Sequence, residues 1–162
     1  MRDMSDERWK PHVTVAAIIE QDKRFLVVEE QTADGLRLNN PAGHLEPGES
    51  LLQAVVREVL EETACAFEPE ALLGVYHWRR DDRADAAVYL RFAFVGRVGA
   101  PAPGRALDAP IVRTLWLGAD ELRAQAHRHR SPLVMRCIDD HLAGRRFALD
   151  LLHFDLGPEA AR

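Results

Sequence analysis

Several segments of the chain carry β-branched and apolar residues in runs or in alternation, as strands do. Residues 12–20 and 25–30 flank a short polar turn at 21–24 and predict a hairpin. Residues 71–79, 87–98 and 111–117 have the same character, and 87–98 alternates well. Polar, glycine-rich or proline-rich segments separate the strands, so loops or turns are expected at 32–40, 68–70, 81–85 and 99–110.

Helical spacing of apolar residues is clearest at 50–64. Pro47-Gly48 marks a turn before this segment, and Glu49 or Ser50 is placed to open the helix, because either side chain suits the positive helix end. Shorter helices are expected at 118–126 and 131–143, followed by a last extended piece at 147–154. Together these elements predict an α+β (mixed α/β) fold, with a mixed sheet between helices.

The chain has 162 residues, which is long enough for one domain with a real core and too short for two ordinary domains. We expect that domain to span 10–156, between a flexible N-terminus at 1–9 and a flexible C-terminus at 157–162. Hydrophobic residues make up 47% and charged residues 29% of the chain, which is typical of a soluble globular protein. The net charge of −5 argues against a protein that coats nucleic acid, but it allows a small phosphorylated substrate.

No feature of the sequence indicates export or a membrane partner. The first ten residues are charged and lack the apolar segment of a signal peptide, and no apolar run approaches transmembrane length. Cys65 and Cys137 have apolar neighbours and are expected to be buried reduced thiols. We therefore expect a cytoplasmic enzyme or binding domain, either monomeric or homodimeric.

The predicted helix at 50–64 concentrates negative charge on one face. Glu58, Glu61 and Glu62 fall within an arc of roughly 100°. The apolar residues lie on the other side, at Leu52, Val55, Val56, Val59 and Leu60. Carboxylates one turn apart repel each other, and Arg57 offsets only part of that repulsion. A divalent hard cation would offset more, because Mg²⁺ binds a few carboxylates together with substrate phosphates; a solvated acidic face is the alternative.

The spacing of these residues is specific. Gly43 is followed after five residues by Glu49, and after seven more by Arg57-Glu58, an aliphatic residue, one further residue and Glu61-Glu62. This pattern resembles the Nudix box and matches it at seven positions of fixed type. The order of predicted elements also resembles the Nudix fold, a mixed sheet sandwiched by helices.

The chain departs from the family pattern at one position. Ala64 stands where the Nudix box has a glycine, which would suit a left-handed residue at the helix end. An alanine in that conformation would cost about 1 kcal/mol, or the helix would end elsewhere. The substitution removes no carboxylate, so it concerns local stability and not the chemistry.

Segments outside the box extend the resemblance over most of the chain, at 10–16, 25–30, 41–46 and 130–134. They resemble a phosphatase branch of the Nudix family. The resemblance implies Mg²⁺, with Mn²⁺ as a possible substitute, and a small-molecule nucleoside or pyrimidine diphosphate substrate. Nucleoside tri- and diphosphates and the pyrophosphate of hydroxymethylpyrimidine are the implied substrates, with orthophosphate as product.

The resemblance also implies roles for the charged residues. Glu61 and Glu62 would bind the metal ions, and Glu58 would either bind a metal or position and deprotonate the attacking water. A backbone carbonyl near Ala42 would be a further ligand. Arg57 would orient Glu49 or Glu61, so that the catalytic set is Glu58, Glu61 and Arg57. Glu49 has helix capping as a competing role, and Glu46 is expected in a solvated loop.

Residues that would contact the rest of the substrate are less clearly marked. Tyr76 and Trp78 share one strand face and could stack on a pyrimidine or purine, although core packing is the commoner fate of such residues. His44 lies beside the metal loop and could touch a phosphate or simply be exposed. Other candidates for phosphate contact are Arg37, Arg79, Arg80, Arg91 and the basic segment 127–130, and further candidate carboxylates are Asp81, Asp82, Asp85, Asp120 and Glu121.

Three functions are compatible with these residues. A Mg²⁺-dependent phosphohydrolase of the branch above is the leading interpretation. A Nudix pyrophosphatase of another specificity, for ADP-ribose or an oxidised nucleotide, would release a nucleoside monophosphate. A non-catalytic binding module would be expected to have lost carboxylates that this chain retains.

Overall fold

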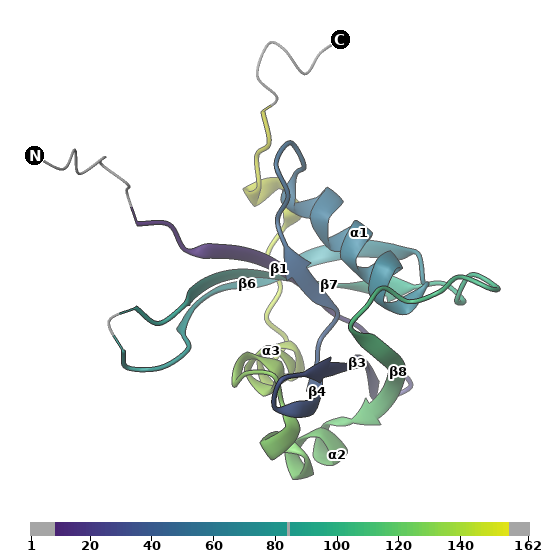
Figure 1. Ribbon diagram of the computed structural model, residues 1–162. Coiled ribbons are helices and arrows are strands. Elements are labelled where there is room, and N and C mark those ends of the chain that lie inside the picture. The colour runs from purple at the N-terminus through teal and green to yellow at the C-terminus, as the bar shows by residue number, and fades with distance from the viewer. Residues whose placement is uncertain (1–8, 84, 156–162) are drawn as a thin grey trace, which may run out of the picture.

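A computed structural model describes residues 9–83 and 85–155 of the chain and shows two four-stranded sheets and three α-helices (Figure 1). The first sheet has the order β5-β1-β7-β6, from β5 (Ala42–His44), β1 (His12–Ile18), β7 (Val88–Val98) and β6 (Phe67–Arg79). The second contains β2 (Glu20–Gln21), β3 (Arg24–Thr32), β4 (Gly35–Asn39) and β8 (Ile111–Gly118). Only β1 and β7 pair in parallel, so the fold is mixed α/β, as predicted.

Alternate residues of β1 serve two separate cores. Val15 and Ala17 pack with Val55 and Val59 of α1 (Leu51–Thr63). Ala16 and Ile18 pack instead with residues of α3 (Leu133–Leu142), beside α2 (Ala119–Ala124). The strand is therefore apolar on both faces, which explains its continuous apolar run, and the helices cover opposite sides of the sheet (Figure 1).

The site-bearing helix α1 has well-defined ends. Ser50 is the N-cap, and its side chain accepts a hydrogen bond from the Gln53 N–H while Gln53 bonds back to the Ser50 N–H. At the other end Ala64 adopts the left-handed conformation, with φ 60° and ψ 12°. Its N–H bonds to Leu60 O and its carbonyl accepts from the Ala102 N–H. The helix thus ends where the glycine of the pattern would end it, with an alanine in the left-handed region.

Several predicted connections are wrong in the structure. Residues 32–40 were expected as a loop, but 35–39 form β4, which pairs with β3. The predicted break at 68–70 lies inside β6, because a register shift between Pro69 and Ala71 accommodates the proline within the strand. The expected extended piece at 147–154 contains a 3₁₀ turn (Leu149–Leu151) after one bridge, Leu72 to Phe147.

The expectation of buried reduced thiols is confirmed, since Cys65 and Cys137 are free and buried. The basic segment 127–130, expected as an exposed loop, overlaps a second 3₁₀ turn (Ala126–Arg128). No helix in the described ranges has the length and apolar character needed to cross a membrane. The predicted flexible ends, apart from Trp9 at one of them, and residue 156 of the predicted domain lie outside the described residues.

The irregular part of β6 depends on Gly96 of β7. A Cβ at Gly96 would lie 2.2 Å from the Glu68 carbonyl oxygen, which is backbone and cannot move aside cheaply. We expect Gly96→Ala to lower the free energy of unfolding by about 1–3 kcal/mol, as overpacking does. Gly99→Ala is the matched control, because a Cβ there meets nothing within 4 Å. Denaturant unfolding measures both variants. Equal stability of the two would contradict the close packing of Gly96 against the irregular part of β6.

Candidate active site

Arg57 lies at the centre of the charged face of α1. Its Nε donates to Glu49 Oε2 at 3.0 Å and its Nη2 to Glu49 Oε1 at 2.6 Å, so the two side chains form a bidentate pair. Nη1 donates to Glu58 at 2.8 Å and to Glu61 at 3.1 Å, and Nη2 also reaches the His44 carbonyl. The guanidinium holds the pKa of Glu49 below its usual value. One cation thus fixes three carboxylates and the loop before the helix.

Gly43 lets the helix approach the edge strand β5. A Cβ added to Gly43 would lie 2.0 Å from the carboxyl carbon of Glu58. The Glu58 carboxylate therefore occupies the space that any other residue at position 43 would fill. Burial raises the pKa of Glu58, and only its bonds with Arg57 oppose that rise.

Glu62 reaches the same strand one helical turn later. Its Oε2 accepts a hydrogen bond of 3.0 Å from the Ala42 N–H. Burial, together with the negative charges of Glu58, Glu30 and Glu61, raises the pKa of Glu62 to about 8. Within the protein alone, this carboxyl lacks the positive charge that would keep it ionised at neutral pH.

The chemistry of these donors fits a divalent hard cation. In the described part of the chain no three His, Cys, Asp or Glu side chains already stand in an arrangement that could hold a metal ion. However, Arg57 and Ala42 engage one oxygen each of Glu58, Glu61 and Glu62, and the other oxygen of each has no hydrogen bond to the described residues. Hard oxygen donors with surplus negative charge are what Mg²⁺ and related ions bind.

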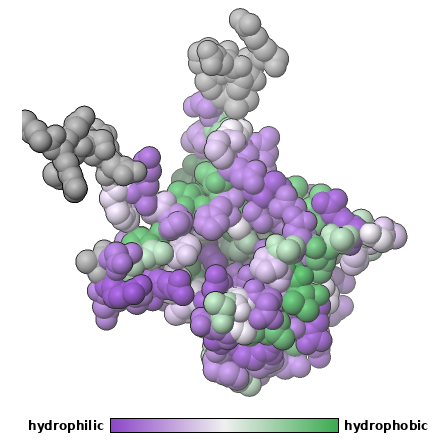
Figure 2. All heavy atoms as spheres, in the orientation of Figure 1, coloured by the Kyte–Doolittle hydropathy of each residue, from purple (hydrophilic) through white to green (hydrophobic). Residues whose placement is uncertain are grey.

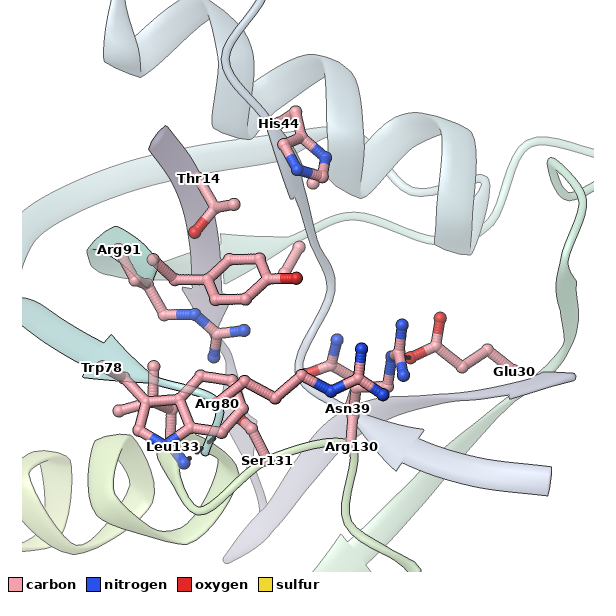
Figure 3. A pocket seen from close by; sticks show the side chains of 13 residues that line it. Thr14, Glu30, Asn39, His44, Trp78, Arg80, Arg91, Arg130, Ser131 and Leu133 are labelled. Carbon is pink, nitrogen blue, oxygen red and sulfur yellow. Dashed lines mark hydrogen bonds and ion pairs between the residues drawn. The ribbon is translucent and has the colours of Figure 1, made fainter. Parts of the chain in front are cut away.

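A polar pocket of about 220 Å³ lies beside the carboxylates (Figure 3). Ala42 and Gly43 of β5 line it, so the same short strand contacts both the pocket and the α1 carboxylates. The rest of the lining comes from β1, β3, β4, β5, β6 and β7, the turn after β6, the segment before α3 and the first residue of α3, at Thr14, Glu30, Asn39, His44, Trp78, Arg80, Tyr89, Arg91, Arg130, Ser131 and Leu133.

Aromatic rings run across one side of this pocket. Trp78 and Tyr89 stack with ring centroids 5.6 Å apart, and Tyr89 stacks on His12 at 5.2 Å. His12 then meets His44 edge-on at 5.6 Å. Strand register explains the row, because Trp78 pairs with Tyr89 across β6 and β7, and Tyr89 with His12 across β7 and β1. The row supplies flat apolar surface of the kind on which a heteroaromatic ring stacks.

The structure brings some predicted substrate residues together and leaves others out. Trp78 and His44 line the pocket, but Tyr76 does not, since its hydroxyl donates to Asp140 of α3 at 2.8 Å and its ring packs against the core. Of the arginines, Arg80 and Arg91 line the pocket. Arg37 instead bonds to the His127 carbonyl, and Arg79 to the carbonyls of the β6–β7 turn. That hairpin is hydrophilic on the face shown in Figure 2.

The remaining candidates have other partners. Arg128 of the basic segment pairs with the buried Glu29, whereas Arg130 lines the pocket with Nε 3.2 Å from Glu30. Glu46 is exposed and 3.8 Å from Arg57. Asp81 and Asp85 pair with Arg83, Asp120 with Arg123, and Glu121 with Arg24. Neither these residues nor Asp82 line the pocket.

The sequence alone does not identify several of the residues with polar groups that line the pocket, chiefly Thr14, Asn39, Tyr89 and Ser131. Thr14 is the one signal that was available, since it is a polar residue inside an apolar strand. The sequence marks its neighbour Arg91 only as an arginine on a strand, because the parallel register that pairs the two depends on contacts between distant segments.

Comparison with known proteins identifies the family. The model of the NUDIX domain matches residues 10–137. The chain is 38% identical over 145 residues to Phosphatase NudJ of Escherichia coli K12, which covers 89% of this chain and 92% of that protein.

Solved structures agree. A NUDIX hydrolase from Nitrosomonas europaea has a TM-score of 0.85 and 53% identity, covering 90% of this chain and 98% of that one. A MutT NUDIX hydrolase from Burkholderia pseudomallei, at 21% identity, shares the fold with a TM-score of 0.68 over 82% of this chain and 98% of its own. Nudix hydrolases generally use divalent metal ions, and they act on small phosphate-containing molecules. With the box residues gathered around Arg57 beside a polar pocket, the chain belongs to the Nudix hydrolase family.

Proposed function

We propose that this protein is a Mg²⁺-dependent phosphohydrolase that acts on nucleoside tri- and diphosphates, and on hydroxymethylpyrimidine pyrophosphate. The observation that carries the proposal is the placement of Glu58 and Glu62 against β5, the strand that also lines the polar pocket, with Glu61 held beside Glu58 by Arg57. A substrate whose ring lies in the pocket has its phosphates beside these carboxylates. The similarity to Phosphatase NudJ supports orthophosphate as the product.

The roles of the chain's residues follow from charge and position. Glu61 and Glu62 would hold Mg²⁺, with a backbone carbonyl near Ala42 as a further donor; the bound ion neutralises charge on the phosphates. Glu58 is the candidate for orienting and deprotonating the attacking water, because burial already favours its protonated form. Arg57 donates hydrogen bonds to Glu49, Glu58 and Glu61 and offsets their mutual repulsion, and so it would position the groups that react.

A phosphate-release screen tests the activity. We expect Mg²⁺-dependent release from at least one nucleoside di- or triphosphate or from hydroxymethylpyrimidine pyrophosphate. Glu61→Gln should reduce kcat by about a hundredfold or more, since metal-assisted charge stabilisation is worth several kcal/mol. Glu70→Gln is the matched control, because Glu70 pairs with Arg97 away from the pocket. An inactive wild type on every diphosphate, or full activity in Glu61→Gln, contradicts the mechanism.

The same screen separates the alternative specificities. ADP-ribose and an oxidised nucleotide are included as substrates, and products are separated by chromatography. Orthophosphate as the first product supports the proposed activity. A nucleoside monophosphate as the first product would instead identify a Nudix pyrophosphatase of another specificity.

Gly43→Ala tests the close approach of Glu58 to β5. The three atoms nearest to the added methyl group all belong to the flexible end of the Glu58 side chain, so the protein should fold with little loss of stability. We expect kcat to fall about tenfold or more, because the displaced carboxylate loses its position relative to the water and the metal. Steady-state kinetics beside a melting curve measure both effects, and unchanged kcat would show that the position of Glu58 is unimportant.

The pH dependence of stability tests the proposed metal site without an activity assay. The folded-state pKa of Glu62, about 8, lies above the ordinary glutamate value of 4.5, so between these pH values the folded protein binds the extra proton. In EDTA the contribution of the protonated Glu62 to the free energy of unfolding is fully present below about pH 4.5 and is lost as the pH rises through 8. Melting temperatures in EDTA should therefore fall between pH 5 and 8 more steeply for the wild type than for Glu62→Gln.

Added Mg²⁺ should raise the wild-type melting temperature most at pH 8, where the carboxylate is available to the ion. Glu62→Gln should show a much smaller increase. Equal Mg²⁺ stabilisation of the two proteins would exclude Glu62 as a ligand.

A further inference from the structure

The pocket holds an unusual set of buried polar atoms without partners. Arg91 is only 7% exposed, and neither its Nε nor its Nη1 has a hydrogen-bond partner in the described protein. Thr14 Oγ1 and Asn39 Oδ1 are also buried without a hydrogen bond, and Glu30 Oε1 has no hydrogen bond but forms an ion pair with Arg130 Nε at 3.2 Å. All four side chains line the one pocket beside the carboxylates, and Figure 3 shows the Arg91 guanidinium reaching into it.

Such atoms are costly for a folded protein. A buried polar group without a partner destabilises the folded state, and a buried charged group without a partner destabilises it more. Burial correspondingly lowers the pKa of Arg91, which lies beside Cys137 with no paired carboxylate. By contrast Arg97, six residues later on β7, is exposed and bonds to Glu68 through two nitrogens. The unpaired state of Arg91 is thus a feature of its place in the pocket.

Resting on the proposed function, we infer that Arg91 selects the substrate by donating hydrogen bonds to an acceptor on the edge of its heteroaromatic ring. Arginine only donates, so the ligand atom it meets must be a carbonyl oxygen or a ring nitrogen. Asn39 Oδ1 only accepts, so the same ligand must also present an amino or ring N–H group; Glu30 already has Arg130 as an ion-pair partner. A nucleobase or aminopyrimidine edge carries both kinds of group.

A phosphate on Arg91 fits these atoms less well. Phosphate oxygens accept, so they would leave Asn39 Oδ1 unpaired and would place a second negative charge near the Glu30 carboxylate. The position of Arg91 in the sheet also favours a ring. It lies on β7 two residues after Tyr89, so the two side chains are on the same face, and Tyr89 stacks with Trp78. A ring stacked on that surface directs its edge toward Arg91.

The test measures binding separately from hydrolysis. Affinities of the wild type, Arg91→Met and Arg91→Lys for ADP, GDP, CDP and UDP are measured by calorimetry in EDTA, with inorganic pyrophosphate as the ringless ligand. Arg91→Met should weaken the best-bound nucleotide by about ten- to hundredfold, as the loss of hydrogen bonds to a charged group does. Arg91→Lys should bind this nucleotide with intermediate affinity, because lysine keeps the positive charge and loses the planar set of guanidinium donors. Pyrophosphate affinity should change less than about threefold.

Stability gives a second readout. Because Met fills a similar volume without unpaired donors, Arg91→Met should melt at the same temperature as the wild type or higher. Arg97→Met is the control and should bind all ligands as the wild type does. A lower melting temperature with unchanged nucleotide affinity would make Arg91 structural. If Arg91→Met loses affinity for nucleotides and for pyrophosphate equally, Arg91 binds a phosphate and not the ring. A wild type that binds no nucleotide would also contradict ring recognition.

These outcomes are independent of the proposed hydrolysis. Nucleotides that bind through Arg91 in EDTA but release no product with Mg²⁺ would contradict the proposed function and leave this inference standing. Mg²⁺-dependent phosphate release that is equal in the wild type and Arg91→Met across all four nucleotides would support the proposed function and contradict this inference.

Discussion

The active site depends on one guanidinium among carboxylates of like charge. Arg57 meets Glu49 with two nitrogens and meets Glu58 and Glu61 with a third. Without it, the loop that contains Glu49 and the face of α1 would carry only repelling charges. Because Arg57 also bonds to the His44 carbonyl, it joins the edge strand to the helix. The interaction therefore orders backbone as well as side chains.

The charge balance of the site is incomplete on the side away from Arg57. Glu62 is held by a backbone N–H and not by a cation, and its raised pKa reflects that difference. Arg91 is buried nearby, and its attraction to Glu30 and Glu62 does not offset its own burial. Within the described residues, the protein thus keeps a carboxyl without a cation partner at β5 and a guanidinium without a carboxylate partner in the pocket. In the proposed roles, a metal ion would relieve the first and an acceptor on the ring of the ligand would relieve the second.

Local patterns predicted what depends on local order. The residues of the box occur within one loop and one helix, so their spacing in the sequence already fixes which of them share a face. The helix, its cap region and most strands followed from periodicity in the same way. Pro69 and residues 35–39 did not, because a register shift and pairing with β3 override the tendency of these residues to form loops.

The pocket could not be predicted in the same way because it is assembled from distant segments. Thr14 and Arg91 become neighbours only through the parallel pairing of β1 with β7. Tyr76 and Trp78 share a strand face, but α3 covers Tyr76 and leaves Trp78 at the pocket. Strand alternation alone does not reveal where a covering helix lies.

The long β6–β7 hairpin has a consequence for how such a protein can change. Trp78, Arg80, Tyr89 and Arg91 all belong to this hairpin, whereas the carboxylates belong to α1. In the proposed roles, the hairpin residues that would contact a ring and the carboxylates that would act in hydrolysis therefore lie in separate stretches of sequence. Substitutions in the hairpin would then change the ring that is bound while the carboxylates stay intact. Descendants of one ancestor can in this way diverge in substrate and retain a common reaction.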